Sequence, residues 1–290
     1  MATPLRLACI SGGYPVWALE AGLAQGLFVQ HGLALEVTAT GSSTVQLAGL
    51  REGRFDTGLQ LADHVVRATA EGCPMVVLAA QSHAPDVALM AAPGVASLEA
   101  LKGQPIGVDG ARSGYALLLR RLLLSRGFGP ADVMLAEVGG TQERADALRQ
   151  GRVQAAFVNP PLDRGLAQAG FIRLTGTREA FPDYPGPVAA CRREWAQAHP
   201  DVASAFQAAW AASWAWLLDP AHAEEAVALA AQRFDVPQAA ATAVLERLRT
   251  QGLPGIDAGG LGVVSELVGE DLAAREAVPD PASLLWPCGA

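Results

Sequence analysis

The polar side chains best suited to holding a small molecule lie in short loops, each of which follows an apolar, strand-like run. Guanidinium, hydroxyl and amide groups hydrogen-bond carboxylate or sulfonate oxygens, and glycines let backbone N–H groups come close to them. The candidate ligand-binding residues in these loops are Ser11, Gly12, Gly13, Tyr14, Gly41, Ser42, Ser43, Arg112, Ser113, Gly114, Gly140, Thr141 and Asn159. This chemistry predicts the binding of a small organic anion, with the ring of Tyr14 packed against its body.

One aspartate and two histidines could move protons. Asp63, His64 and His83 each stand just past the end of a predicted strand. In an enzyme they would be the acid–base groups, and Asp63 and His83 are also candidates for contact with a ligand. A lone histidine is more often structural than functional. No nucleophile elbow or ordered Ser, His and Asp set is recognisable, which argues against hydrolysis by a triad.

Most of the loop candidates also have a structural explanation. Ser42, Ser43 and Ser113 each stand where a helix begins, and a serine there caps the first turn. Arg112 could be a solvated surface residue, and Gly12–Gly13 a tight turn. Both explanations stay open at the level of the sequence.

The loops belong to a regular alternation of strands and helices. Apolar runs at 5–10, 105–108, 133–138 and 155–158 predict strands, and each is followed by a small-residue loop and a helical pattern. Such alternation predicts an α/β fold with mostly parallel sheets covered by helices. Ligands of such sheets sit beyond the carboxyl ends of the strands, where helix N-termini expose N–H groups. The loops are therefore expected to share one site.

The last third of the chain has a helical pattern. Helices are predicted over 201–218, 221–234 and 237–251, and the remainder reads as a short appendage. The tryptophans of this region are Trp195, Trp210, Trp214 and Trp216. Their spacing favours a packing core between helices over an aromatic ligand box.

Composition excludes several classes of protein. The 290 residues are 51% hydrophobic and 17% charged, enough for about two full cores. A net charge of −8 argues against a nucleic-acid partner. No Walker A loop or dinucleotide fingerprint is present, so no cofactor is predicted. The four cysteines lack metal-ligand spacing, so we predict no metal and expect free thiols, as in a reducing compartment.

The chain as written begins with a strand rather than with a secretory signal. No apolar run is long enough to span a membrane, so membrane insertion is not expected. These features predict a cytoplasmic protein, or a periplasmic one if a leader has been removed.

The order of these motifs resembles a known family, the substrate-binding proteins of nitrate, taurine and alkanesulfonate ABC transporters. These proteins have the type II periplasmic-binding-protein fold. The motifs that carry the resemblance are Gly12–Pro15, Ala24–Leu33, Thr40–Ser43, Gly53–Asp56, Ser97–Gly103 and Asn159–Pro161. Each is weak alone, and their joint order and spacing from Pro4 to Phe234 are more specific.

The resemblance implies two lobes with the ligand enclosed between them. Lobe I would comprise residues 1–88 and 190–290, and lobe II residues 89–189. The extended apolar segments Val87–Ala91 and Pro187–Cys191 would be the crossovers and hinges. The partners implied are a small carboxylate or sulfonate and an ABC permease.

Two alternatives to a transport role remain at this stage. An enzyme on the same scaffold, a lyase or decarboxylase acting on a small carboxylate, would use the acid–base groups above. The cysteine-rich motif of related thiamin-pathway proteins is absent. A sensor that passes ligand occupancy to a partner protein is the second alternative.

Overall fold

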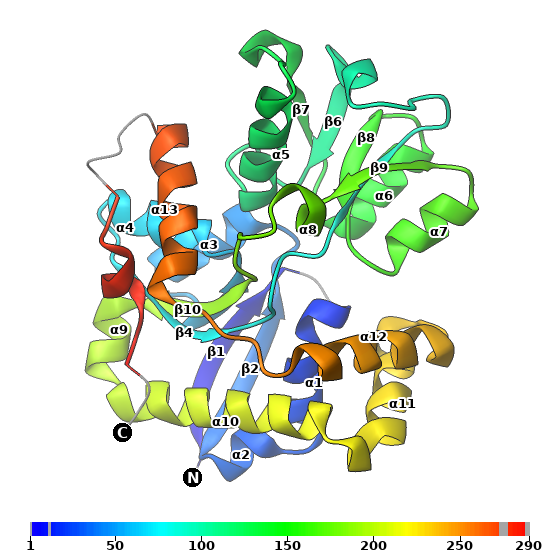
Figure 1. Cartoon of the computed structure of the whole chain (residues 1–290). Coiled ribbons are helices and arrows are strands. Elements are labelled where there is room, and N and C mark those ends of the chain that lie inside the picture. Colours follow the sequence, from blue (N-terminus) through cyan, green and yellow to red (C-terminus); the bar gives the residue numbers. More distant parts are fainter. Residues whose placement is uncertain (1, 11–12, 273–277, 288–290) are drawn as a thin grey trace.

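The computed structural model describes residues 2–10, 13–272 and 278–287 of the chain, and it contains two five-stranded sheets (Figure 1). The first sheet has the order β2-β1-β3-β10-β4. Its strands are β1 (Thr3–Cys9), β2 (Leu33–Ala39), β3 (Thr57–Gln60), β4 (Met75–Ala80) and β10 (Val188–Arg192). Strand β1 pairs in parallel with β2 and β3, whereas β10 is antiparallel to both β3 and β4.

The second sheet repeats this design with the order β7-β6-β8-β5-β9. Its strands are β5 (Ala88–Ala91), β6 (Pro105–Val108), β7 (Met134–Glu137), β8 (Ala155–Val158) and β9 (Ile172–Gly176). Strand β6 is parallel to β7 and β8, and β5 is antiparallel to β8 and β9. The antiparallel strands β5 and β10 are those that enter a sheet after the chain has left the other one. The predicted two-lobed α/β fold is therefore confirmed.

Helices cover the faces of both sheets (Figure 1). The first lobe carries α1 (Trp17–Ala24), α2 (Leu27–Gln30), α3 (Ser43–Arg51) and α4 (Asp63–Ala70). The second carries α5 (Gly114–Ser125), α6 (Thr141–Arg149), α7 (Leu162–Gln168) and α8 (Thr177–Ala180). The C-terminal helices are α9 (Arg193–Ala198), α10 (Pro200–Leu218), α11 (Ala223–Phe234), α12 (Gln238–Gln251) and α13 (Ala258–Leu272). Short 3₁₀ turns are η1 (Tyr14–Val16), η2 (Glu99–Leu101), η3 (Pro130–Asp132), η4 (Pro220–His222) and η6 (Pro281–Leu284).

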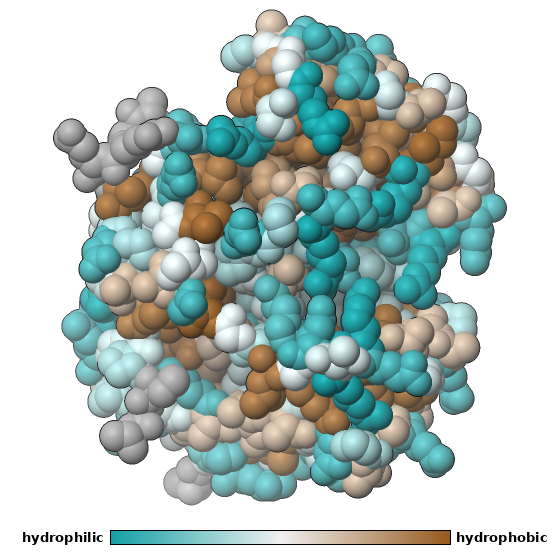
Figure 2. Space-filling model, in the orientation of Figure 1, coloured by the Kyte–Doolittle hydropathy of each residue, from teal (hydrophilic) through white to brown (hydrophobic). Residues whose placement is uncertain are grey.

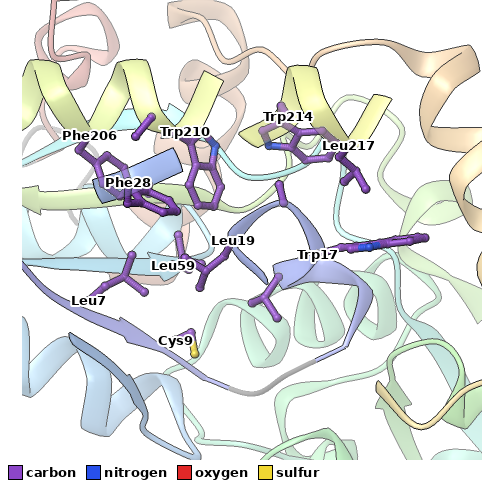
Figure 3. Packing of buried hydrophobic residues seen from close by; sticks show 14 of the residues in the cluster. Leu7, Cys9, Trp17, Leu19, Phe28, Leu59, Phe206, Trp210, Trp214 and Leu217 are labelled. Carbon is purple, nitrogen blue, oxygen red and sulfur yellow. The ribbon is translucent and has the colours of Figure 1, made fainter. Parts of the chain in front are cut away.

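The long helix α10 forms the core of the first lobe together with α1 and the sheet. Trp210 and Trp214 are buried in this core, and Figure 3 shows Trp210 beside Phe206 and Phe28. The indole of Trp210 donates a hydrogen bond to the carbonyl of Ala80, 2.8 Å away. The prediction of a tryptophan packing core is confirmed for these two residues.

The C-terminal region corrects one prediction, because α13 is a 15-residue helix and not a short appendage. Three glycines in the first turns give this segment low helix propensity, which hid the helix in the sequence. Packing supplies the missing stability, since Val264 and Val268 are buried. Asp271 on α13 accepts hydrogen bonds from Arg67 of α4 and from Arg120 of α5. The helix thus contacts both lobes.

None of the helices in the described part of the chain is long and apolar enough to cross a membrane. On the face shown in Figure 2, hydrophilic side chains gather along the boundary between the two lobes. This boundary is where the site lies.

Candidate functional site

A cavity of about 130 Å³ lies between the lobes, at the carboxyl ends of strands from both sheets. Cys9 and Gln60 end β1 and β3, and Asp109 and Asn159 directly follow β6 and β8. The parallel strands of the two sheets therefore direct their carboxyl ends at one space, as expected for this class of fold. Its further lining includes Ile10, Tyr14, Gln81, Asp86, Tyr115, Thr141, Arg144, Arg178, Val244, Arg247 and Leu248.

The first-lobe wall of the cavity is largely apolar and aromatic. Tyr14 packs against Trp17 and Phe234, with ring centroids 5.5 and 5.8 Å away, and Val244 and Leu248 of α12 complete this side. The hydroxyl of Tyr14 is buried without a hydrogen-bond partner among the described residues. Burial raises the pKa of this phenol, so it stays neutral and able to donate a hydrogen bond.

A buried arginine supplies the positive charge of the second-lobe wall. The side chain of Arg144 is 4% exposed. Its Nε donates to the carbonyl of Phe157 at 2.7 Å and its Nη1 donates to the carbonyl of Gly139 at 2.9 Å. Burial lowers the pKa of Arg144 and the nearby Asp109 raises it, but a guanidinium stays protonated at neutral pH. Two backbone carbonyls thus hold a fixed cation beside the cavity.

Asp109 connects the two lobes at the cavity. Its Oδ2 accepts a hydrogen bond of 2.6 Å from the hydroxyl of Ser43, which begins α3 in the first lobe. Its Oδ1 lies 4.0 Å from Nη1 of Arg144 and accepts no hydrogen bond from the described residues. This short hydrogen bond joins a residue of one lobe to a residue of the other, so it helps to hold the lobes together.

A second charged group lines the cavity at the first crossover. Asp86 pairs with Arg178 of α8 at 3.2 Å and with Arg247 of α12 at 3.0 Å. With Asp109 and Arg144, three arginines and two aspartates line the cavity. The lining therefore has an excess of one positive charge in a chain whose net charge is −8, and this local charge suits an anion.

Several of the residues predicted from the sequence come together at this cavity. Tyr14, Thr141 and Asn159 line it, and Thr141 Oγ1 accepts a hydrogen bond from the backbone N–H of Asn159. The loops that hold Gly41 and Gly140 meet, since a Cβ at Gly140 would lie 3.2 Å from the carbonyl of Gly41. Gly13 is the N-cap of η1 and directly precedes Tyr14, which lines the cavity. Ser11 and Gly12 lie outside the described residues.

Other predicted residues lie away from the cavity. Arg112 is an exposed residue whose guanidinium pairs with Glu71. Ser42 and Ser113 act as N-caps of α3 and α5, as each accepts a hydrogen bond from a backbone N–H of the first turn. Gly114 packs against Asp63. The observed contacts of Ser42 and Ser113 are therefore those of helix caps, the alternative that the sequence left open.

The three candidate acid–base groups do not line the cavity. Asp63 is fully buried, and His64 Nε2 lies 3.8 Å from its carboxylate. The Nδ1 of His64 is 3.3 Å from Oε1 of Gln60, a residue that does reach the cavity. His83 lies near the backbone of Gln251 at the end of α12, and burial lowers its pKa. The structure therefore places these groups in two separate environments.

Sequence reasoning missed the charged residues of the cavity. Asp109 directly follows a predicted strand, and Arg144 lies one turn into the helix after Gly140. For both residues, their position near the end of a strand was the only signal in the sequence that they could reach the site. Arg247 comes from a distant C-terminal helix, for which no local signal exists. Cys9 also lines the cavity, and burial raises its pKa to about 11, so it is a thiol at neutral pH. The described residues contain no cluster of three or more His, Cys, Asp or Glu that could hold a metal.

Two lobes, two crossovers and an interlobe cavity define the class of periplasmic-binding-protein-like folds. Within this class the chain belongs to the NMT1-like family, whose model matches residues 16–231. A search of curated proteins finds no match. The resemblance predicted from the sequence motifs is thus confirmed at the level of the family.

Solved structures with the same fold cover nearly the whole chain. A protein of Bordetella bronchiseptica RB50 is 22% identical with a TM-score of 0.83, covering 98% of this chain and 94% of that one. The alkanesulfonate-binding protein SsuA from Xanthomonas axonopodis pv. citri, bound to MOPS, is 18% identical with a TM-score of 0.77, covering 99% of each chain. The ligand binding component of an ABC-type import system from Staphylococcus aureus, with zinc bound, is 19% identical with a TM-score of 0.76, covering 98% and 97%. At these identities the likeness shows the fold.

Proposed function

We propose that this protein binds a small organic anion between its lobes, as the solute-binding component of an ABC-type uptake system. The ligand would be a carboxylate or sulfonate with an apolar or aromatic body. The names of the structural neighbours support this class, since they include a sulfonate-binding protein and a component of an import system. The role implies a permease as partner and a periplasmic location.

One observation carries the proposal, the buried guanidinium of Arg144 beside the cavity. Because backbone carbonyls fix two of its nitrogens, an anionic head group meets a cation that is already oriented. Pre-orientation lowers the entropy cost of binding. Asn159, Thr141 and the Tyr14 hydroxyl would add neutral hydrogen-bonding groups, and the aromatic and aliphatic wall of the first lobe would pack the body.

Calorimetric titration with defined anions tests the proposal. The probes are nitrate, taurine, butanesulfonate, benzoate and benzenesulfonate, each titrated into the purified chain. We expect at least one organic anion to bind, and Arg144→Gln to weaken it at least about tenfold, because a charged hydrogen bond contributes about 1.5 to 3 kcal/mol.

The matched control is Arg149→Gln on the same helix. Arg149 is a surface residue that pairs with Asp146 one turn away, so this variant should bind as the unaltered protein does. Circular dichroism would confirm that both variants are folded. If none of the organic anions binds, or if both variants bind equally well, the proposal fails.

The structure offers no comparable support for a lyase or decarboxylase activity. Such a reaction needs a proton-transfer group within hydrogen-bonding reach of the substrate. Asp63, His64 and His83 do not line the cavity, and the Cys9 thiol has a raised pKa. We therefore propose no enzymatic function.

A further inference from the structure

A second contact between the lobes is formed by Asp63 and Gly114. Asp63 is the first residue of α4 in the first lobe, and Gly114 is the first residue of α5 in the second (Figure 1). A Cβ built on Gly114 would lie 2.1 Å from Oδ1 of Asp63 and 2.7 Å from Cδ1 of Leu61. The carboxyl group of one lobe thus presses directly on the backbone of the other.

The carboxyl group of Asp63 has no hydrogen-bond partner in this contact. The residue is 0% exposed, and neither Oδ1 nor Oδ2 accepts a hydrogen bond from another described residue. The buried hydroxyl of Tyr184 is also without such a partner. When the lobes meet, the carboxyl group loses its water and gains no hydrogen bond in return, which disfavours its ionised form.

The charged neighbours of Asp63 only partly offset this loss. On α4, His64 Nε2 lies 3.8 Å away, and Arg67 is engaged by Asp271 at 2.8 Å. From the second lobe Asp109 adds a negative charge, and the positive end of α5 adds a weak attraction. Burial is the largest effect and raises the pKa of the Asp63 carboxyl. His64, Arg67 and the backbone N–H of Asp63 itself lower this pKa, and Asp109 raises it further.

We propose that Asp63 is a proton-dependent switch of lobe closure. Ionised, it favours lobes that have moved apart far enough to let water reach the carboxylate. Protonated, it permits the contact with Gly114 seen in this structure. The closed arrangement is fully favoured below the pKa that Asp63 has when the lobes are apart, because Asp63 is then protonated in both arrangements. It weakens as pH rises toward and through the raised pKa of the closed arrangement. Between these two pKa values the closure equilibrium changes by up to about tenfold per pH unit.

Hydrogen–deuterium exchange between pH 5 and pH 8 tests the switch without any ligand, so its outcome is separate from that of the anion titrations. The backbone amides to follow are those of residues 61–65 and 114–118, with intrinsic exchange corrected by unstructured peptides. In the unaltered protein we expect protection of both segments to increase as pH falls. In Asp63→Asn we expect protection that is independent of pH and as high as that of the unaltered protein at pH 5.

Asp201→Asn is the matched control, because Asp201 is an exposed aspartate in the first turn of α10. It should retain the pH dependence of the unaltered protein. If the pH dependence persists in Asp63→Asn, it arises from His64 or another group and the proposal is wrong. Protection in the unaltered protein that is constant with pH, or that rises with pH, also overturns it, even if the variant fails to fold.

Discussion

The two contacts between the lobes, at Asp109 and at Asp63, place an aspartate in opposite situations. Asp109 accepts a hydrogen bond from Ser43 of the other lobe and has Arg144 at 4.0 Å. Asp63 packs against the backbone of Gly114 in the other lobe, and its carboxyl oxygens accept no hydrogen bond from another described residue. Both carboxyl groups are buried, yet Asp109 gains Ser43 as a hydrogen-bond partner when the lobes meet, whereas Asp63 loses water without a replacement.

This difference assigns ligand binding and the control of lobe closure to two separate parts of the boundary between the lobes. The Asp109 side has a cavity, arginines and hydrogen-bonding loops, so it can exchange contacts with a ligand. The Asp63 side has no room, because any side chain at position 114 would collide with it. Ligand chemistry and control of closure are thus expected to respond to different mutations.

Gly114→Ala should have the largest effect. The added methyl group would lie 2.1 Å from Asp63 Oδ1, so either the lobes separate or the packing is strained. Overpacking of this kind costs about 3 kcal/mol of unfolding free energy. Denaturant unfolding measures the loss, and small-angle scattering would show an increased radius of gyration if the lobes separate.

Gly165→Ala is the control for this substitution. It is also a helical glycine, but a Cβ there meets nothing within 4 Å. Helix propensity predicts a gain of up to about 1 kcal/mol. Equal stability of the two variants would show that the Asp63 contact tolerates an added atom, and the contrast between the two boundaries would be lost.

Ser43→Ala should have an intermediate effect, because it removes the short hydroxyl hydrogen bond that Asp109 accepts from the other lobe and leaves only the 3.4 Å bond from the Ser43 backbone N–H. Removing one partner of a buried hydrogen bond predicts a decrease of about 2 kcal/mol in unfolding free energy. Thermal unfolding by calorimetry measures it. The neighbouring Ser42→Ala removes only the cap of α3 and should cost about 1 kcal/mol; a larger cost at Ser42 would contradict the role assigned to Asp109.

Arg112→Gln should have the smallest effect. Its side chain is 65% exposed and pairs with Glu71 at the surface. Surface ion pairs contribute about 0.5 kcal/mol, and the guanidinium does not line the cavity. Stability and the affinity for any anion that binds should therefore stay nearly unchanged. A tenfold loss of affinity would place Arg112 in the binding site after all.

The alternation of apolar runs and small-residue loops predicted the α/β class, and the resemblance carried by the loop motifs added the two lobes. Each predicted strand from 5–10 to 155–158 is present within a few residues, because strand and helix periodicity are local properties of a sequence. Helix α13 escaped prediction because Gly259, Gly260 and Gly262 mask its pattern, and packing against α4 and α5 stabilises it instead.

For the site, sequence alone determined which loops meet and not which side chains face the cavity. Tyr14, Thr141 and Asn159 were predicted from loop position and do line it, whereas Arg112 points to the surface and Arg144 lies at the cavity. Loop position follows from strand order. The direction of a side chain depends on contacts with distant segments. Ser43 of the other lobe orients Asp109, and α12 brings Arg247 to the cavity from the C-terminal part of the chain. Local periodicity determines where helices and strands form. Only the packing of distant segments decides which charged side chains are buried side by side, and this burial distinguishes a residue of the binding site from a surface residue.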